Sequence, residues 1–457
     1  MKFKSGQRRR AIEYEKDLVQ QWKKHKTFEK SVELRDPANS YVFYDGPPFI
    51  TGVPHHGTLL SSIIKDAVPR YQTMKGKRVE RRWGWDCHGL PAENFVEKQL
   101  GIADRRQILV DDSQQAPLDK DGKPMPTITL EKYIETARDS MIANSETWQG
   151  VIDRVGRWVD FKGAYRTMNK DFMESVWWAF KQLYNAGKIY EGEKVLMYDT
   201  RFATPVSKAE VTMDNDAYQT VTDPSVYVKF QLTAEAVKAL KVPADTAILA
   251  WTTTPWTLPA NMVLAISPEM KYVLVESGGD RLIVAEDCLE RVFQDDKHQP
   301  IVYKVVRQIA GGDLVGLTYQ PLPTGSTWPT DPETVVKIHR VYAADFVTNE
   351  SGTGIVHVAP AYGEDDFALC QANGIKAFHV IDDNGYYFDS IYKGREVWSN
   401  NKFIAKDLLE KGVVWRIEYI RHEYPFNPRS KQRIMYRAIP SWFFDIQDAK
   451  PLLLEQN

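Results

Sequence analysis

One stretch, residues 41–91, constrains the fold of this 457-residue chain more than any other. An apolar run at 41–44 predicts a buried strand, and Asp-Gly-Pro-Pro at 45–48 predicts the turn that ends it. Apolar residues then recur at helical spacing, so a helix is expected to begin at 55–58, and a second strand is expected at 77–83. Strand, helix and strand within this length predict a βαβ unit, and therefore a parallel sheet of the Rossmann type.

The start of that helix is a candidate phosphate site. It carries His55, His56, Gly57 and Thr58. A helix start presents unpaired N–H groups and the positive end of the helix dipole, both of which suit a phosphate. Paired histidines at such a place are more often a surface feature or a cap, so the position alone does not establish catalysis. Pro69 is expected to kink the helix or to end it early.

Composition limits the class of protein. With 43% hydrophobic and 26% charged residues, the chain is a globular protein of about two or three domains. A net charge of −2 excludes a global basic field, although a basic cluster at 75–82 borders the candidate site.

Cys87, Cys288 and Cys370 are far apart, which argues against disulfides and against a cysteine zinc site. The basic N-terminus has no apolar signal core and no run reaches the roughly 18 residues of a membrane span, so we expect a cytoplasmic protein that binds no membrane.

Helical patterns also occur at 8–30, 130–149 and 171–187, and a polar, proline-containing loop is expected at 111–128. Gly187 is expected to end the last of these helices.

From about residue 195 the sequence pattern changes to short runs of β-branched residues separated by turn signals. Such runs predict a mostly β, barrel-like domain. It is expected to be inserted at 195–418 between a first part at 1–194 and a return at 419–457, because insertion at a loop is tolerated when the inserted ends lie close together. The predicted strands are 226–230, 246–251, 272–275, 282–284, 302–306, 335–338 and 355–358.

Two motifs, DGPPFITGVPHHGT at 45–58 and GWDCHGLPAE at 84–93, resemble the ATP-binding region of class I aminoacyl-tRNA synthetases, specifically isoleucyl-tRNA synthetases. The family's HIGH signature falls on residues 55–58, and the resemblance implies that His55, Gly57 and Thr58 contact ATP bound with Mg²⁺. Thr58 stands where the signature has its second histidine. A hydroxyl can still donate to a phosphate, but it cannot carry positive charge.

The same resemblance implies an isoleucine site. Gly46 would give a backbone contact, Pro47 an apolar wall, and Asp86 a partner for the amine. Trp442 resembles a tryptophan that walls this pocket, although by itself it would be read as an ordinary core aromatic. Trp158 lies in another segment that resembles the family, and we interpret it as a core residue.

The β-rich part carries two stretches, 251–261 and 352–366, that resemble the editing domain of isoleucyl-tRNA synthetases. Alone, a threonine run is explained by β propensity, and an acidic cluster by a helix cap. The resemblance implies that His357 limits the size of the admitted side chain, and that Asp366 binds the α-ammonium group. The implied editing residues are Thr252, Thr253, Thr254, Asn261, His357 and Asp366.

An editing site has an energetic reason. Valine lacks one methylene of isoleucine, and a hydrophobic pocket gains only about 1–3 kcal/mol from that group, a value established for synthetases rather than derived from this chain. A second pocket that admits valine and excludes isoleucine would supply the missing discrimination.

The segment 421–430 aligns with a family segment that often carries a zinc knuckle, but Asn427 and Ser430 occupy the cysteine positions, so no zinc is expected there. The chain is expected to stop before the KMSKS region, which leaves an incomplete parallel sheet with an uncovered edge. The predicted function is an isoleucine-tRNA ligase with editing, a monomer whose partners are the tRNA(Ile) acceptor end, isoleucine and ATP. The alternatives are an editing hydrolase alone and a non-catalytic tRNA-acceptor-binding module.

Overall fold

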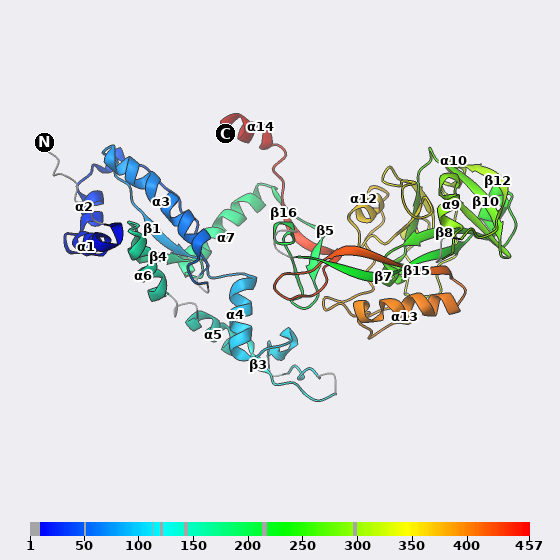
Figure 1. The fold of residues 1–457 in the computed structure, drawn as a ribbon, viewed down its shortest axis with the longest axis horizontal. Coiled ribbons are helices and arrows are strands. Elements are labelled where there is room, and N and C mark those ends of the chain that lie inside the picture. The colour runs from blue at the N-terminus through cyan, green and yellow to red at the C-terminus, as the bar shows by residue number, and fades with distance from the viewer. Residues whose placement is uncertain are drawn as a thin grey trace. The chain divides into compact units, whose positions relative to one another are not determined.

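The computed structural model describes residues 10–49, 52–111, 113–118, 122–140, 145–212, 217–295 and 299–457. The chain divides into two compact units, the first ending at Ile189 and the second beginning at Tyr190 (Figure 1).

The first unit is mainly helical around a short parallel sheet. Its strands β1 and β4 pair in parallel, and the small strands β2 and β3 form a separate parallel pair. Its elements are α1 (Ala11–Lys24), α2 (Thr27–Glu33), α3 (His56–Met74), β1 (Arg82–Trp85), α4 (Leu90–Leu100), β2 (Ile108–Leu109), β3 (Ile128–Thr129), α5 (Leu130–Ser140), α6 (Ser145–Val155), β4 (Asp160–Arg166) and α7 (Lys170–Asn185).

The predicted buried strand at 41–44 is wrong. Two isolated parallel bridges, Ser40–Arg78 and Phe49–Asp86, tie residues 40–49 to the chain around β1, but no continuous ladder forms between them. Tyr44 is 92% exposed, so the run is not buried. The prolines at 47–48 lack N–H groups and cannot donate to a ladder that continues beyond this run.

The predicted helices form, with different bounds. The helix α3 begins at His56 and continues through Pro69 to Met74, so the proline does not end it, and the alternative expectation of a kink stays a prediction. Losing one N–H donor is tolerated within a helix of 19 residues. The pattern at 8–30 splits into α1 and α2 at Lys26, whose φ is +50°. In the pattern at 130–149 the described residues form α5 up to Ser140 and α6 from Ser145, and residues 141–144 lie outside the described part. Gly187, with φ +69°, follows α7 as predicted.

The core of the first unit is an aromatic cluster on β1, β4 and α6. Trp83 stacks on Phe161 at a centroid distance of 4.6 Å and meets Trp85 edge to face at 5.4 Å. Trp158 was interpreted as core, but it is only half-buried. It lies edge to face with Trp22 while the Arg70 guanidinium covers its ring at 4.0 Å.

The second unit is built on β-strands. Its elements are β5 (Ile189–Asp199), β6 (Thr204–Pro205), β7 (Tyr218–Gln231), α8 (Ala234–Leu240), β8 (Thr246–Thr252), β9 (Val263–Ile266), β10 (Lys271–Ser277), β11 (Asp280–Ala285), α9 (Leu289–Val292), β12 (Lys304–Ala310), α10 (Gly311–Leu314), α11 (Pro332–Val335), β13 (Val341–Ala343), β14 (Ile355–Val358), α12 (Glu364–Ala372), α13 (Val397–Glu410), β15 (Val414–Pro425), β16 (Met435–Phe444) and α14 (Lys450–Gln456).

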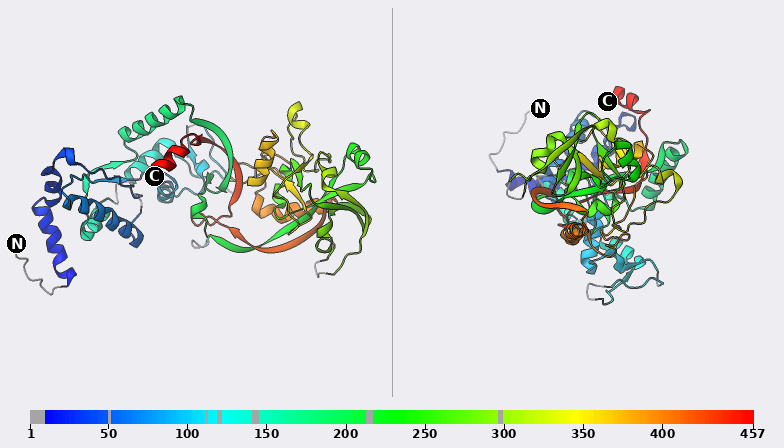
Figure 2. Two further views of the ribbon diagram at one scale, coloured as in Figure 1. Left: turned by 90° about the horizontal axis from the view of Figure 1, so that it is seen from above. Right: turned by 90° about the vertical axis from the view of Figure 1, so that its right-hand side faces the viewer.

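Nine of these strands form one curled, mixed sheet (Figure 2). Its order is β12-β10-β11-β8-β14-β9-β13, with β7 paired to β8 and β15 paired to β7. The strand β14 is antiparallel to β9, whereas β11 and β8 run in parallel. A second, three-stranded sheet has the order β16-β5-β6. The nine-stranded sheet buries a large hydrophobic core in which Val226, Phe230, Ile248 and Leu249 have no exposed surface.

The expected predominance of β-strands in this part of the chain is confirmed. One predicted strand, at 335–338, is wrong. Residues 335–338 form the end of α11 and the turn after it, because Asp331 accepts the N–H of Thr334 and Pro332 begins a helix well. The strands β9, β13 and β15 of the nine-stranded sheet were not predicted. The proposed limits at 194 and 418 stay predictions.

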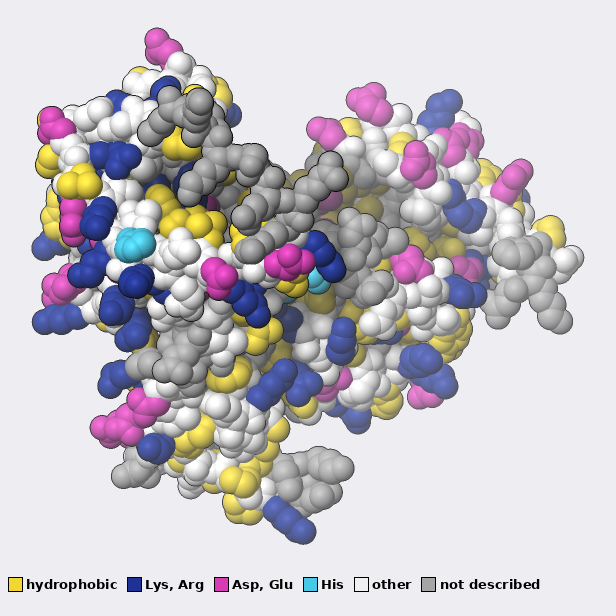
Figure 3. Space-filling view, turned by 60° about the vertical axis from the view of Figure 1, so that its left-hand side comes forward, with side chains coloured by type: hydrophobic (Ala, Val, Ile, Leu, Met, Phe, Trp, Pro, Cys, Tyr) yellow, Lys and Arg dark blue, Asp and Glu magenta, His cyan; other side chains and the backbone are white. Residues whose placement is uncertain are grey.

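Several helices of the first unit carry apolar side chains that the described residues leave uncovered. On α3, Leu60, Ile63 and Ile64 are more than half exposed, and on α7 Trp177 and Trp178 are 68% and 66% exposed. Figure 3 shows hydrophobic side chains lying among Lys and Arg side chains on the surface.

Candidate functional site

The loop after residue 44 is held by ion pairs. The carboxylate of Asp45 pairs with Lys65 on α3 at 2.6 Å and with the buried guanidinium of Arg157. Lys65 Nζ also donates to the carbonyl of Gly46 at 2.8 Å. Arg157 donates a further bond to Ser62 Oγ at 3.0 Å, so the loop, α3 and the segment before β4 are joined by one polar network.

A separate backbone contact brings the predicted isoleucine-site residues of the first unit near one another. The N–H of Asp86 donates to the carbonyl of Pro48 at 2.9 Å, which places Asp86 beside the loop that carries Gly46 and Pro47. Asp86 follows the carboxyl end of β1, where ligands bind in parallel sheets. Trp442 lies on β16 in the second unit and is 54% exposed; its role stays a prediction.

His55 is the N-cap residue of α3. Its Nδ1 accepts the backbone N–H of Thr58 at 3.4 Å, so in the neutral ring the N–H donor is Nε2. The ring also covers Gly57, where a Cβ would lie 3.1 Å from the His55 ring. The first turn of α3 contains no acidic residue, which fits the binding of a phosphate.

Sequence reasoning missed Asp45, Lys65 and Arg157 as parts of this site. Asp45 is indistinguishable in sequence from any aspartate of a turn, and its partners lie 20 and 112 positions away in the chain. Only the fold shows that this carboxylate holds the loop.

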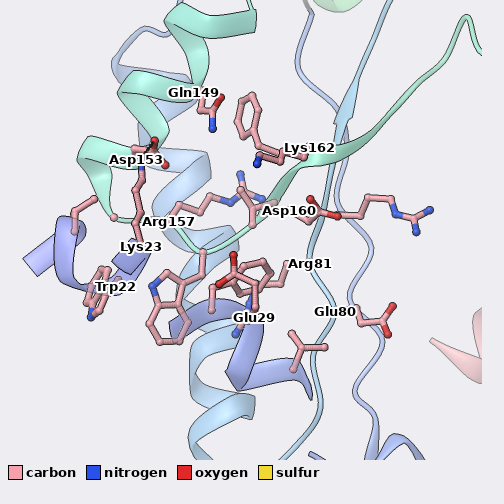
Figure 4. A pocket seen from close by; sticks show the side chains of 18 of the residues that line it. Trp22, Lys23, Glu29, Glu80, Arg81, Gln149, Asp153, Arg157, Asp160 and Lys162 are labelled. Atoms are coloured by element: carbon pink, nitrogen blue, oxygen red, sulfur yellow. Dashed lines mark hydrogen bonds and ion pairs between the residues drawn. The ribbon is translucent and has the colours of Figure 1, made fainter. Parts of the chain in front are cut away.

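A cavity of about 640 Å³ lies elsewhere in the first unit, between α1, α2, α6 and the segment leading into β4 (Figure 4). It is lined by aromatic side chains and by charged groups of both signs, including the Lys23–Asp153 ion pair. Burial lowers the pKa of Arg81 in its wall to about 10, and this guanidinium donates to Thr73 Oγ1 at 2.6 Å. None of the predicted site residues lines this cavity.

In the second unit, the threonines at the end of β8 and just after it are hydrogen-bonded to one another. Thr254 donates its N–H to Thr252 Oγ1 at 3.1 Å, and the two hydroxyls are also 3.1 Å apart. Thr257 donates to the carbonyl of Thr254 at 2.8 Å, and its hydroxyl lies 3.1 Å from that of Thr254. Thr253 is half-buried between them.

His357 on β14 closes this network. Its Nε2 lies 3.0 Å from Thr257 Oγ1, and its Nδ1 lies 2.8 Å from Asn261 Nδ2. The Asn261 amide also donates to the carbonyl of Val263 at 3.1 Å. A carbonyl can only accept, so the amide nitrogen faces both groups, His357 Nδ1 is an acceptor, and the proton of the ring is on Nε2.

His357 is therefore a neutral side chain with both ring nitrogens occupied. Burial lowers its pKa to about 3, so it stays neutral at physiological pH. Such a ring can shape a pocket, but it has no free nitrogen with which to accept a proton from water. Thr257 was missed by the sequence analysis, although it continues the threonine-rich run that pointed to this segment.

Asp366 lies in the first turn of α12. Its Oδ2 accepts the N–H of Ala359, the residue after β14, at 2.7 Å. Burial raises the pKa of this carboxyl to about 7. Gly363 makes room for it, because a Cβ there would lie 2.8 Å from Asp366 Cγ. The strand β14 thus carries His357 and, one residue beyond its end, the anchor of Asp366.

Asn427 and Ser430, which align with the cysteine positions of the family's zinc knuckle, lie around a buried carboxylate. Asp199 at the end of β5 is fully buried, and its Oδ2 accepts from Asn427 Nδ2 at 2.6 Å and from Ser430 Oγ. Its Oδ1 accepts the N–H groups of Arg201 and Phe202 at 2.8 and 2.9 Å. Across the described ranges, no cluster of His, Cys, Asp and Glu could hold a metal ion.

Comparison with known proteins gives the family. Residues 17–457 match the family model of tRNA synthetases class I (I, L, M and V). The chain belongs to the class I aminoacyl-tRNA synthetase family. It is 41% identical over 442 residues to isoleucine-tRNA ligase 2 of Pseudomonas fluorescens, covering 96% of this chain and 39% of that protein. It is 40% identical over 454 residues to the isoleucine-tRNA ligase of Nocardia farcinica, covering 97% and 40%. The resemblance to isoleucyl-tRNA synthetases is thus confirmed.

The chain spans about two-fifths of the length of these curated relatives. Among solved structures, GlLeuRS-CP1 matches 42% of this synthetase chain and 98% of its own, with 15% identity and a TM-score of 0.34, a value too low to define a common fold. Of the helices that the structure describes, none is both long and apolar enough to cross a membrane.

Proposed function

We propose that this chain is part of an isoleucine-tRNA ligase that also hydrolyses mischarged valyl-tRNA(Ile). In this proposal the first unit contributes an incomplete Rossmann-type sheet with the ATP and isoleucine sites, and the curled sheet of the second unit is the inserted editing domain. The supporting observations are the identity of about 40% to isoleucine-tRNA ligases and the grouping of the predicted residues within each unit.

The ligase reaction joins isoleucine to ATP and releases pyrophosphate, and the acyl group then passes to the terminal ribose of tRNA(Ile). His55 Nε2–H and Thr58 at the start of α3 would donate to the ATP phosphates as their charge grows in the transition state. Mg²⁺ would arrive with the nucleotide. Gly46 and Pro47 would line the isoleucine site, and the carboxylate of Asp86 would bind the ammonium group of isoleucine. The role of Trp442 rests on the family resemblance alone. We propose a monomer that works in the cytoplasm without a membrane partner.

The observation that carries the editing function is the buried network of Thr252, Thr254, Thr257, His357 and Asn261, with Asp366 anchored beyond the same strand. In the proposed reaction, water attacks the ester carbonyl. The ester C–O bond breaks and valine leaves as the carboxylate, while one proton of the attacking water goes to the ribose oxygen of tRNA and the other goes to solvent.

In this reaction Asp366 would bind the ammonium group of the mischarged amino acid in its ionised form. A positive ligand stabilises the ionised carboxylate, which opposes the effect of burial on its pKa. His357, neutral and with both nitrogens occupied, would set the depth of the pocket.

An editing hydrolase that acts without ligase activity is a second candidate. The second unit favours it, because this unit has its own large core and contains all six predicted editing residues.

The test is the hydrolysis of valyl-tRNA(Ile) and isoleucyl-tRNA(Ile) by the purified chain. Selective loss of the valyl ester is expected. Asp366→Ala should abolish it, and the control Asp365→Ala should not, because Asp365 is the exposed neighbour on the same helical turn. A folded chain that hydrolyses neither ester would overturn the editing function and leave a tRNA-acceptor-binding module. Isoleucine-dependent exchange of pyrophosphate into ATP by the complete polypeptide tests the ligase function.

A further inference from the structure

The hydrogen bonds of His357 continue away from the pocket to a residue that no motif includes. The hydroxyl of Tyr319 donates to Asn261 Oδ1 at 2.7 Å, and the amide of Asn261 contacts His357 Nδ1. The exposed fractions of Tyr319, Asn261 and His357 are 1%, 1% and 6%. Burial raises the pKa of Tyr319 well above its ordinary value, so its hydroxyl keeps its proton and remains a donor.

Two groups hold the Asn261 amide, and they do different things. The carbonyl of Val263 can only accept, so it decides which way the amide faces. A tyrosine hydroxyl can donate or accept, so Tyr319 does not decide the orientation. It holds the amide oxygen from the opposite side and thereby fixes where the amide sits. Without it, the buried oxygen would lose the donor that the structure gives it.

Aromatic packing couples the same residues. The ring of Phe230 meets Tyr319 edge to face at a centroid distance of 5.2 Å, and it stacks on His357 at 6.5 Å. Phe230 itself is fully buried. The imidazole is therefore supported on its face by Phe230 and at its nitrogens by Asn261 and Thr257, and Tyr319 contacts two of these three supports.

We propose that Tyr319 is a positioning residue of the editing site, which holds Asn261, and through it the His357 ring, at the depth that excludes an isoleucyl side chain. This inference rests on the proposed editing function. Valine and isoleucine differ by one methylene, so a displacement of the ring by about 1 Å is enough to change which ester fits.

Tyr319→Phe is the direct test, because it removes only the hydroxyl. The matched control is Tyr272→Phe. Tyr272 is also fully buried in the same core, and its hydroxyl donates to the carbonyl of Gly354 at 2.9 Å, outside this network. The ratio of kcat/KM for valyl-tRNA to that for isoleucyl-tRNA should fall about three- to tenfold in Tyr319→Phe, the factor that corresponds to one neutral hydrogen bond. The fall should come from faster hydrolysis of the isoleucyl ester, with no change of the ratio in the control. An unchanged ratio in Tyr319→Phe, or an equal fall in both variants, would overturn the inference.

A second readout does not depend on hydrolysis. In ¹⁵N NMR of the whole chain, His357 should be neutral with its proton on Nε2, and the side-chain amide of Asn261 should exchange slowly with solvent. Tyr319→Phe should accelerate that exchange about tenfold, and Tyr272→Phe should leave it unchanged. An unchanged exchange rate in Tyr319→Phe overturns the positioning role, whereas hydrolysis of neither ester by the wild-type chain overturns the proposed function. The two failures are therefore distinguishable.

Discussion

Asp366→Asn should make the second unit more stable at high pH. Burial raises the pKa of Asp366 from 3.8 to about 7, so the folded state holds a proton that the unfolded state releases. The contribution of the protonated Asp366 carboxyl to the free energy of unfolding is fully present below pH 3.8 and is lost as the pH rises through about 7. A shift of about three pH units at about 1.4 kcal/mol each gives about 4 kcal/mol. This value is an upper bound because the residue is half-buried rather than fully enclosed.

Asparagine keeps an oxygen for the N–H of Ala359 but cannot ionise. The free energy of unfolding of Asp366→Asn, relative to the wild type, should therefore increase between pH 4 and pH 8 by up to about 4 kcal/mol. Urea unfolding, monitored by hydrogen exchange of the amides in β14 and α12, measures the free energy of unfolding of the second unit alone. Asp365→Asn is the control, since this change at an exposed neighbour leaves the buried carboxyl of Asp366 in place.

The same pH dependence of stability in the wild type and in Asp366→Asn would refute this reasoning. A confirmed difference would mean that the fold retains a carboxylate that costs stability at neutral pH. Such a cost is typical of a functional group.

His357→Ala should increase hydrolysis of isoleucyl-tRNA at least about tenfold in a deacylation assay, because the ring would no longer limit the pocket; unchanged exclusion would contradict this role. Asp199→Ala leaves four donors without their acceptor, two of them on the buried side chains of Asn427 and Ser430, and should lower the free energy of unfolding by about 3 kcal/mol, so an unaltered urea midpoint would show that these bonds contribute little. Leu249→Ala, in the core, should cost about 2–5 kcal/mol in the same assay. Leu60→Ala, at a position that is 62% exposed, should cost less than about 0.5 kcal/mol, and equal losses would contradict the burial argument.

Local patterns predicted the elements whose signals are local. The start of α3, Gly187 after α7 and half of the described strands of the second unit follow from periodicity, caps and turn residues. Residues 335–338 were misread because their β-branched side chains suggested a strand, while the cap at Asp331 and the following proline favoured a helical turn. The run at 41–44 failed for the opposite reason, since an apolar segment becomes a strand only where a partner supplies a ladder.

The sequence by itself determined the family, through motifs long enough to be specific, and it determined the identity of the candidate site residues. Only the tertiary structure decided what those residues can do. The tautomer of His357 depends on Asn261 and Val263, the pKa of Asp366 depends on its burial, and the hold on the loop at Asp45 depends on Arg157. These partners are distant in the chain or belong to no motif. Hydrogen-bond direction and desolvation arise from three-dimensional surroundings, so no reading of spacing could have supplied them.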